Sequence, residues 1–338
     1  MTAFGDAIRA QPENLAAASA AFAGAVAEVD LEALRDGTIV FGGIGASAHA
    51  LIPAVLALRA AGRRAFAVSA TELTKPGARQ LGDAFVLVSQ SGASAETVAA
   101  LERIEGAPVI AISARGDSPL AKAAQAWLPL GPLPDTPVAT LSYTATLQAL
   151  GMLCQALLGE AKPDSVWGRL PELAGGVIEA GGRFVEALAD GFAGASALDA
   201  VGGGPGHASA GEAALLGREA LRLPATGMET REYLHGPLEA VAPGFGAVVF
   251  GRRREHELAR ALASFGATVA LISDRPAEAA GVLERAEAAG VLELPEVPTV
   301  AAPILQILPV QLLVDRVAAL RGLTIGELRR HQGDTKVA

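Results

Sequence analysis

Short, continuous apolar segments alternate with helix-forming stretches along most of this 338-residue chain. In a parallel sheet that helices cover on both faces, strands are unbroken apolar runs rather than alternating ones. The runs that we predict as strands are 38–42, 64–69, 84–89, 108–113 and 126–130 in the first half, and 198–202, 246–250, 268–273 and 291–294 in the second. This pattern predicts an α/β protein built on parallel sheets.

The two halves of the chain repeat this pattern at a nearly constant distance. Gly43 directly follows one predicted strand and Gly202 ends another, and they lie 159 residues apart, while Ser113 and Ser273 end two similar strands and lie 160 residues apart. The constant offset predicts a duplicated unit, and hence two similar αβα sandwich domains, each a parallel sheet flanked by helices. The expected parts are an N-terminal helix at 1–25, a first domain at 26–162, a connecting helix at 163–193, a second domain at 194–325 and a tail at 326–338.

Composition limits the classes of partner. Apolar residues make up 51% of the chain and charged residues 19%, which is enough apolar material for a large core and excludes a disordered chain. The formal net charge of −9 argues against nucleic acid or an anionic membrane as a partner, because both attract basic surfaces. Cys154 is the only cysteine, and the five histidines have no paired ligand spacing. We therefore expect no disulfide, no metal and no cofactor.

Two long uncharged stretches, 136–159 and 297–314, need to be compared with membrane spans. Polar residues interrupt the first, and prolines and glutamines interrupt the second, whereas a spanning helix needs about 20 predominantly apolar residues. The first thirteen residues include Asp6, Arg9 and Glu13, which is not the pattern of a signal peptide. We expect a soluble cytoplasmic protein.

A hydroxyl-rich turn directly follows the strand predicted at 84–89. Its residues are Ser89, Gln90, Ser91, Gly92, Ala93 and Ser94. A helix-forming stretch comes next, and a helix N-terminus binds anions through its unpaired N–H groups and the positive end of its dipole, to which serine hydroxyls add donors. The turn contains no lysine or arginine and does not match GxxxxGK[ST]. It predicts a phosphate monoester site made of neutral donors, with a simple N-capping turn at Ser94 as the alternative.

The segment 43–48 (Gly-Ile-Gly-Ala-Ser-Ala) also follows a predicted strand and matches the dinucleotide-binding pattern GxGxx(G/A). The acidic residue expected about 20 positions later is missing, because Arg63 and Arg64 stand there. The segment is therefore a tight strand-to-helix turn or a loop that lines a ligand. The alternative hypothesis, that the protein is a nicotinamide-dependent oxidoreductase, depends on this match alone.

A carboxylate and an imidazole are the candidate acid–base groups. Glu219 lies among leucines in an apolar helical pattern, where a carboxylate either faces solvent or serves a function. After Pro224, a run of turn-like residues leads to His235, which precedes Gly236-Pro237 in a stiff turn suited to presenting an imidazole. An exposed helix glutamate and a structural histidine are the alternatives.

Several motifs occur together in an order that resembles the tandem sugar-isomerase (SIS) domain family. The motifs are GIGAS at 43–47, SQSGASAET at 89–97, VATLSYT at 138–144, the stretch 202–238 and APILQILPVQLLVDRVAALRG at 302–322. Within the family, the chain looks most like the isomerase half of glutamine–fructose-6-phosphate aminotransferase, stand-alone hexosamine-6-phosphate deaminases and fructosamine-6-phosphate deglycases. No glutaminase domain is expected, so glutamine-dependent amide transfer is not either.

The resemblance implies a phosphosugar isomerase or deaminase and assigns roles to particular residues. It places the sugar phosphate on Ser89, Gln90, Ser91 and Ser94, with Ala46 and Ser47 alongside and Thr140 in a third loop. Glu219 would be the base that moves a proton between C1 and C2 of a hexose- or hexosamine-6-phosphate, and His235 would open the sugar ring. In the family this histidine comes from the partner subunit, so the resemblance also implies a homodimer.

Three lysines usual in the family are replaced. Leu216 and Leu141 stand at two of these positions, and a gapless comparison puts Gly333 at the third, three residues before Lys336. The loss of amines near the carbonyl weakens any Schiff-base mechanism and leaves acid–base work by Glu219 and His235. A non-catalytic regulator that binds a sugar phosphate is therefore the alternative function.

Overall fold

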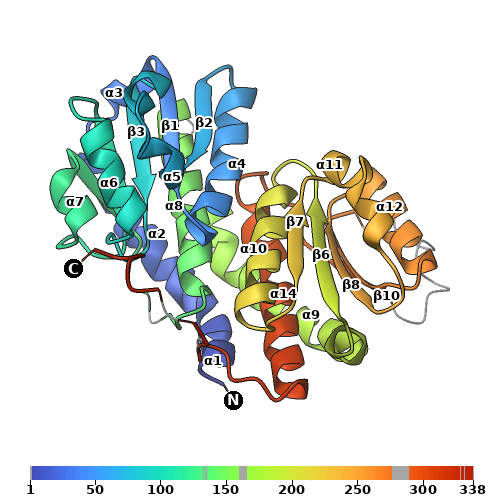
Figure 1. Ribbon diagram of the computed structural model, residues 1–338. Coiled ribbons are helices and arrows are strands. Elements are labelled where there is room, and N and C mark those ends of the chain that lie inside the picture. Colours follow the sequence, from blue (N-terminus) through green and yellow to red (C-terminus); the bar gives the residue numbers. More distant parts are fainter. Residues whose placement is uncertain are drawn as a thin grey trace. The chain divides into compact units, whose positions relative to one another are not determined.

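The computed structural model describes residues 2–131, 133, 135–159, 166–275, 289–327, 329–330 and 332–337. By internal contacts the chain divides into two units, each built around one five-stranded sheet. The β1–β5 unit comprises residues 12–134, 141–171 and 329–338; the β6–β10 unit comprises residues 1–11, 135–140 and 172–328. Each unit is described by itself below, and Figure 1 labels their elements. The domain boundaries expected from the sequence stay a prediction.

The sheet of the β1–β5 unit is parallel throughout. Its strands are β1 (Thr38–Gly43), β2 (Arg64–Ser69), β3 (Ala84–Val88), β4 (Val109–Ser113) and β5 (Ala126–Pro129), in the order β2-β1-β3-β4-β5. Every residue of β3 and β4 is buried, as expected for strands covered on both faces.

Helices cover both faces of this sheet. The helical elements are α2 (Gln11–Glu28), α3 (Glu32–Arg35), α4 (Ala46–Ala60), α5 (Ala70–Leu73), η1 (Ala78–Leu81), α6 (Ala95–Arg103), α7 (Pro119–Ala123) and α8 (Leu141–Leu158). On one face, α4 packs on β1 and β2 and against α8. On the other face, α5, α6 and α7 pack on alternate strand residues such as Val40, Phe85 and Val109.

The sheet of the β6–β10 unit is also parallel and has an equivalent strand order. Its strands are β6 (Ala197–Gly202), β7 (Ala225–Met228), β8 (Phe245–Phe250), β9 (Thr268–Ser273) and β10 (Ala289–Glu293), in the order β7-β6-β8-β9-β10. The helical elements are α1 (Ala3–Arg9), α9 (Val166–Ala193), α10 (Gly206–Glu219), α11 (Thr230–Leu234), η2 (Pro237–Ala240), α12 (Arg253–Ser264) and α14 (Ala302–Leu320). α10 packs on β6, β7 and α14, while α12 packs on β8 and β9 (Figure 1).

The predicted α/β class and the two similar parallel sheets are confirmed, and each predicted strand is present close to its expected bounds. One strand was missed, because residues 225–228 looked turn-like and in fact form β7. Gly227 explains the error: a Cβ there would lie 2.6 Å from the carbonyl oxygen of Ala210 in α10. The glycine permits close packing of helix on strand, and it does not mark a turn.

Each sheet has a point where the strand order reverses. In the first sheet β1 lies between β2 and β3. In the second sheet β6 lies between β7 and β8. In open α/β sheets, ligands bind outside the carboxyl ends of the strands at such a point. In the β1–β5 unit this point is flanked by the loop after β1 and the serine-rich loop after β3.

The glycines that lie 159 residues apart make the same kind of turn. A Cβ at Gly43 would lie 3.1 Å from the backbone carbon of Ser47, and a Cβ at Gly202 would lie 2.5 Å from the carbonyl oxygen of Gly206. Both strands therefore turn sharply into α4 and α10; a side chain would be crowded at Gly43 and does not fit at Gly202 without a shift of the backbone.

By length and composition alone, α8 and α14 could cross a membrane. However, 78% of the apolar stretch of α8 and 67% of that of α14 are buried inside the protein. Such burial is typical of core helices.

Candidate functional site

The serine loop, defined as residues 89–94, joins β3 to α6. Ser89 is buried, and its hydroxyl is hydrogen-bonded to that of Ser94 with the two oxygens 2.9 Å apart. Ser91 Oγ accepts the N–H of Ala93 at 3.3 Å, and Gln90 is exposed. Ser94 holds the N-cap position of α6, yet its side chain makes no capping hydrogen bond. The structure thus brings the three predicted serines together in one turn, in which the Ser89 and Ser94 hydroxyls bond to each other and Ser94 does not cap the helix.

Neighbouring segments hold this loop in place. Gln90 O accepts the N–H of Ala114, and Gly92 O accepts the N–H of Leu120, each at 3.0 Å. Gly92 has a φ of +66°, and a Cβ there would overlap the Ser118 hydroxyl. The loop is therefore fixed before any ligand binds, which lowers the entropic cost of binding.

Ala46 and Ser47 lie in the first turn of α4, directly after β1. The N-cap residue Gly45 has a φ of +58° and supplies no side-chain cap. Because β1 and β3 are neighbouring parallel strands, the N-termini of α4 and α6 both lie at the carboxyl ends of the strands. Two helix N-termini at this end of the sheet favour a bound anion, as the serine loop predicts.

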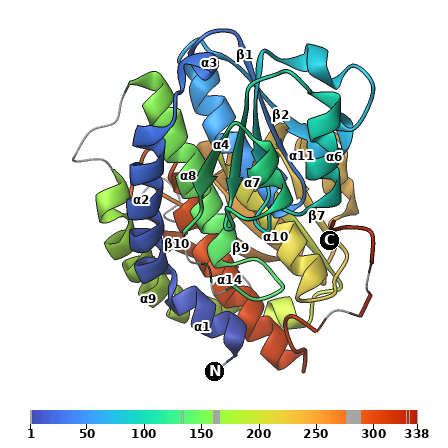
Figure 2. The same ribbon diagram turned by 90° about the vertical axis from the view of Figure 1, so that its left-hand side faces the viewer.

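The C-terminal tail pairs with the serine loop. Lys336 and Ser94 form an antiparallel bridge, the N–H of Ala95 donates to Thr335 O at 3.0 Å, and the N–H of Val337 donates to Ala93 O at 2.9 Å. The dark red C-terminal segment ends near α6 in both views (Figures 1 and 2). One N–H at the start of α6 is therefore occupied by the tail, and the exposed Lys336 brings a positive charge to a loop that has none.

Thr140 belongs to the β6–β10 unit, separate from the serine loop. Its side chain is buried, and its hydroxyl donates to the Asp135 carboxylate, which also accepts the Thr140 N–H at 3.1 Å.

Glu219 is the last residue of α10. Although the residue as a whole is exposed, desolvation of its carboxyl group raises its pKa from 4.5 to about 7, with repulsion from Glu212 as the second cause. Glu212 lies seven residues, or about two turns, earlier on the same helix face. That spacing is visible in the sequence, but the role of Glu212 was missed.

His235 is the exposed C-cap residue of α11, and its N–H donates to Glu232 O at 3.1 Å. Gly236 follows with a φ of +141°, which confirms the predicted turn. α10 runs back from the carboxyl end of β6 to the start of β7, and α11 follows the end of β7 (Figure 1). Glu219 therefore precedes β7 at the amino end of the strand and His235 follows it beyond the carboxyl end; β7 itself, with four residues, is about 13 Å long.

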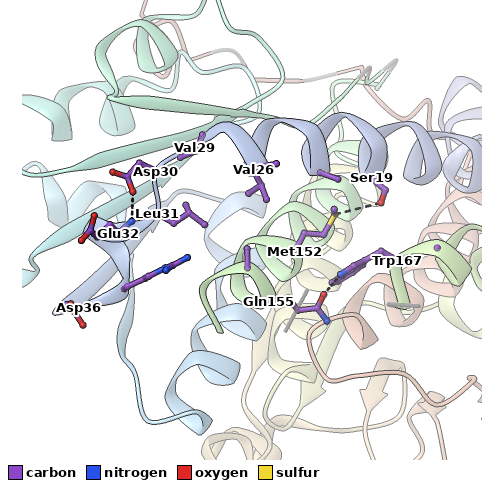
Figure 3. Close-up of a pocket in the computed structure, with 15 residues that line it drawn as sticks. Ser19, Val26, Val29, Asp30, Leu31, Glu32, Asp36, Met152, Gln155 and Trp167 are labelled. Atoms are coloured by element: carbon purple, nitrogen blue, oxygen red, sulfur yellow. Dashed lines mark hydrogen bonds between the residues drawn. The ribbon is translucent and has the colours of Figure 1, made fainter. Parts of the chain in front are cut away.

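None of these residues lines either of two cavities that the structure contains. One of about 1160 Å³ is lined by α2, α3, α8 and the start of α9, with acidic side chains at one end and Met152, Gln155 and Trp167 at the other (Figure 3). The other, of about 280 Å³, lies at the carboxyl ends of β6, β8 and β9. Among the described residues, no group of three or more histidine, cysteine, aspartate or glutamate side chains is arranged to hold a metal ion.

Comparison with protein families gives a match to the SIS domain over residues 34–158, the region that contains the serine loop. The match covers less than half of the chain. The family model matches this one segment, so the second SIS domain of the predicted tandem pair is not shown, although the second sheet has the equivalent strand order.

About 72% of the chain is similar to part of larger enzymes. A glutamine–fructose-6-phosphate aminotransferase (isomerizing) of Gloeobacter violaceus is 29% identical over 263 residues, which cover 72% of this chain and 42% of that protein. The corresponding protein of Corynebacterium diphtheriae is 28% identical over 265 residues. The chain thus spans less than half the length of these curated relatives.

Solved structures share the fold of the whole chain. Glucosamine-6-phosphate deaminase from Thermotoga maritima has a TM-score of 0.79 at 19% identity, with both chains covered completely. Tagatose-6-phosphate ketose/aldose isomerase from Escherichia coli has a TM-score of 0.81 at 21% identity, covering 100% of this chain and 96% of that one. At these identities the likeness shows the fold alone.

Proposed function

We propose that this protein is a phosphosugar isomerase or deaminase that moves a proton between C1 and C2 of a hexose- or hexosamine-6-phosphate. The observation that carries the proposal is the Glu219 carboxyl, whose pKa of about 7 suits a group that takes up and returns a proton near neutral pH. The names of the similar proteins, which include fructose-, glucosamine- and tagatose-6-phosphate, support this substrate class.

The phosphate is proposed to bind at the serine loop. The donors are the hydroxyls of Ser89, Ser91 and Ser94 and the amide of Gln90. The first turn of α4, with Ala46 and Ser47, lies at the same carboxyl end of the strands. Thr140 is retained as a substrate residue in this proposal on the resemblance alone.

In the proposed reaction, His235 donates a proton to the ring oxygen and the anomeric hydroxyl loses one, which opens the ring. The Glu219 carboxylate then removes the proton on the carbon next to the carbonyl, giving an enediol, and returns it to the neighbouring carbon. If the substrate carries an amine at C2, the same transfer gives an imine, which water hydrolyses to the ketose and ammonia.

The placement of the two groups supports a homodimer. Glu219 and His235 of one chain flank opposite ends of β7, a placement that favours a site in which a second copy supplies one of the two groups. We propose that His235 crosses to the partner's site. A cytoplasmic location is part of the same proposal.

Co-expression of Glu219→Gln and His235→Ala chains tests the shared site. Each variant alone is expected to keep only a small residual activity, whereas a mixed dimer has one site with both residues intact and regains activity. The measurement is turnover of purified mixed dimers carrying two different tags. Mixed dimers as inactive as the single variants would show that both groups come from one chain.

The reaction itself is tested by proton NMR of the purified protein with glucosamine 6-phosphate and with fructose 6-phosphate in D₂O. Deuterium at the carbons flanking the carbonyl together with ammonia indicates a deaminase, and deuterium without ammonia an isomerase. Binding without exchange of either sugar contradicts the proposed catalysis and favours the sugar-phosphate-binding regulator.

Replacing Lys336 with methionine tests the tail. The change is expected to weaken the binding of inorganic phosphate about two- to fivefold, because an exposed charge contributes little. The effect should shrink at high salt. Arg103→Met, at the opposite end of α6, removes the same charge about 13 Å away and serves as the control. Equal losses for the two variants, measured by calorimetry, would show that Lys336 acts only through net charge.

A further inference from the structure

Helix α11 has five residues and ends at His235. A helix this short is not stable by itself, so tertiary contacts must set its position. Two side-chain hydrogen bonds do so: Tyr233 Oη donates to Asp199 Oδ2 at 2.7 Å, and Thr230 Oγ1 donates to Glu255 Oε1 at 2.8 Å. They hold α11 at its first residue and near its last one.

Asp199 occupies an unusual place for a carboxylate. It lies in the middle of β6, between β7 and β8, and is 9% exposed. Its side chain shares the sheet face of Val201, which with Val249 and the Tyr233 ring belongs to the apolar cluster under α12. An apolar residue would suit this position better, because a buried carboxylate is costly to desolvate. Packing therefore does not explain Asp199, whereas the hydrogen bond from Tyr233 does.

Glu255 is held as firmly. Its Oε2 accepts the N–H of Arg252 at 3.0 Å, while its Oε1 accepts the Thr230 hydroxyl. The carboxylate fits against two glycines, since a Cβ at Gly203 or at Gly251 would lie 2.8 or 2.7 Å from it. Both anchors of α11 are thus fixed carboxylates on neighbouring elements of the same unit.

We propose that Asp199 and Glu255 are positioning residues: through Tyr233 and Thr230 they hold α11 so that His235 is presented in one place and orientation. The inference deepens the proposed function, because it depends on the acid–base role proposed for His235. Neither Asp199 nor Glu255 touches the substrate in this proposal.

The first test needs no substrate. Tyr233→Phe keeps the buried ring but removes the hydroxyl, and the amides of residues 229–236 are expected to exchange with D₂O roughly 10-fold faster because one buried hydrogen bond is lost. Thr230→Val should act in the same way. Asp199→Asn keeps an acceptor for the tyrosine and should leave exchange near the wild-type rate. Ser209→Ala, which removes a buried hydroxyl on α10, is the matched control. Unchanged exchange in Tyr233→Phe would overturn the proposal.

The second test separates positioning from general stability. If His235 moves by about 1 Å, Tyr233→Phe is expected to lower kcat about 100-fold with little change in KM. The same substitution made in the His235→Ala protein should then have no further effect, since the group being positioned is gone. Equal losses in both backgrounds would assign Tyr233 a structural role only. If His235→Ala alone leaves turnover unchanged, the proposed role of His235 fails, and the exchange experiment still decides whether the anchors hold α11.

Discussion

Replacing Glu219 with glutamine is expected to lower proton transfer between C1 and C2 about 10²- to 10⁴-fold, the range typical of a lost general base. Glutamine has nearly the same shape as glutamate but does not accept a proton near neutral pH. Phosphate affinity should be unchanged, because the serine loop is left intact. The measurement is deuterium entry into the sugar in D₂O, beside a phosphate titration of the same protein.

Glu257→Gln, which changes an exposed glutamate on α12, is the matched control and should leave the rate as it is. If Glu219→Gln and Glu257→Gln exchange protons equally well, Glu219 is not the base.

The pH dependence of kcat/KM provides a second readout for Glu219. A base must be ionised to act, and burial raises the pKa of Glu219 from 4.5 to about 7, so activity should fall as the pH drops through about 7. Glu212→Gln removes the repulsion between the two carboxylates, which is the second cause of the raised pKa. The fall in kcat/KM should then occur at lower pH. Because the raised pKa means that the folded protein binds the proton more tightly, stability falls as the pH rises from 4.5 to 7. Glu219→Gln should therefore have a higher Tm than the wild type at pH 8 and a similar Tm at pH 4.

Much of the fold is predictable from local sequence patterns. Runs such as those in β3 and β4 are apolar because both faces of these strands are buried, and Gly43 and Gly202 mark sharp turns that crowd a Cβ at the first and exclude it at the second. β7 was not predicted because it contains a glycine. This glycine is needed for the close packing of α10 on β7, and no local sequence pattern indicates that contact.

Part of the candidate site was likewise predictable from the local sequence, and part was not. The serine loop is contiguous, so its residues and its position after a strand were predictable. The pairing of Lys336 with Ser94 and the hydrogen bond between Tyr233 and Asp199 join residues far apart in the chain. Nothing in the local sequence around Asp199 indicates that a tyrosine 34 residues later is its partner. Such contacts depend on tertiary structure, and so does the separation of Glu219 from His235.

Ser94→Asp is expected to stabilise the protein and abolish its phosphate binding at the same time. Ser94 makes no capping bond, whereas an aspartate there accepts from the first N–H groups of α6 and favours the helix dipole, which contributes about 0.5–2 kcal/mol. The same carboxylate takes up the donors that phosphate needs and repels the anion, so affinity should fall at least about 100-fold, since like charges brought together cost several kcal/mol.

The matched variant is Ser94→Asn, which caps the helix equally well without a charge. It should raise the Tm as aspartate does, while phosphate binding weakens far less. The two quantities are measured by thermal unfolding and by calorimetric titration with inorganic phosphate and glucose 6-phosphate. If Ser94→Asp binds both anions as tightly as the wild type does, the turn is not an anion site, and the phosphate of the substrate must bind elsewhere. Opposite changes in stability and affinity, in the aspartate variant alone, are what an anion site at the start of α6 requires.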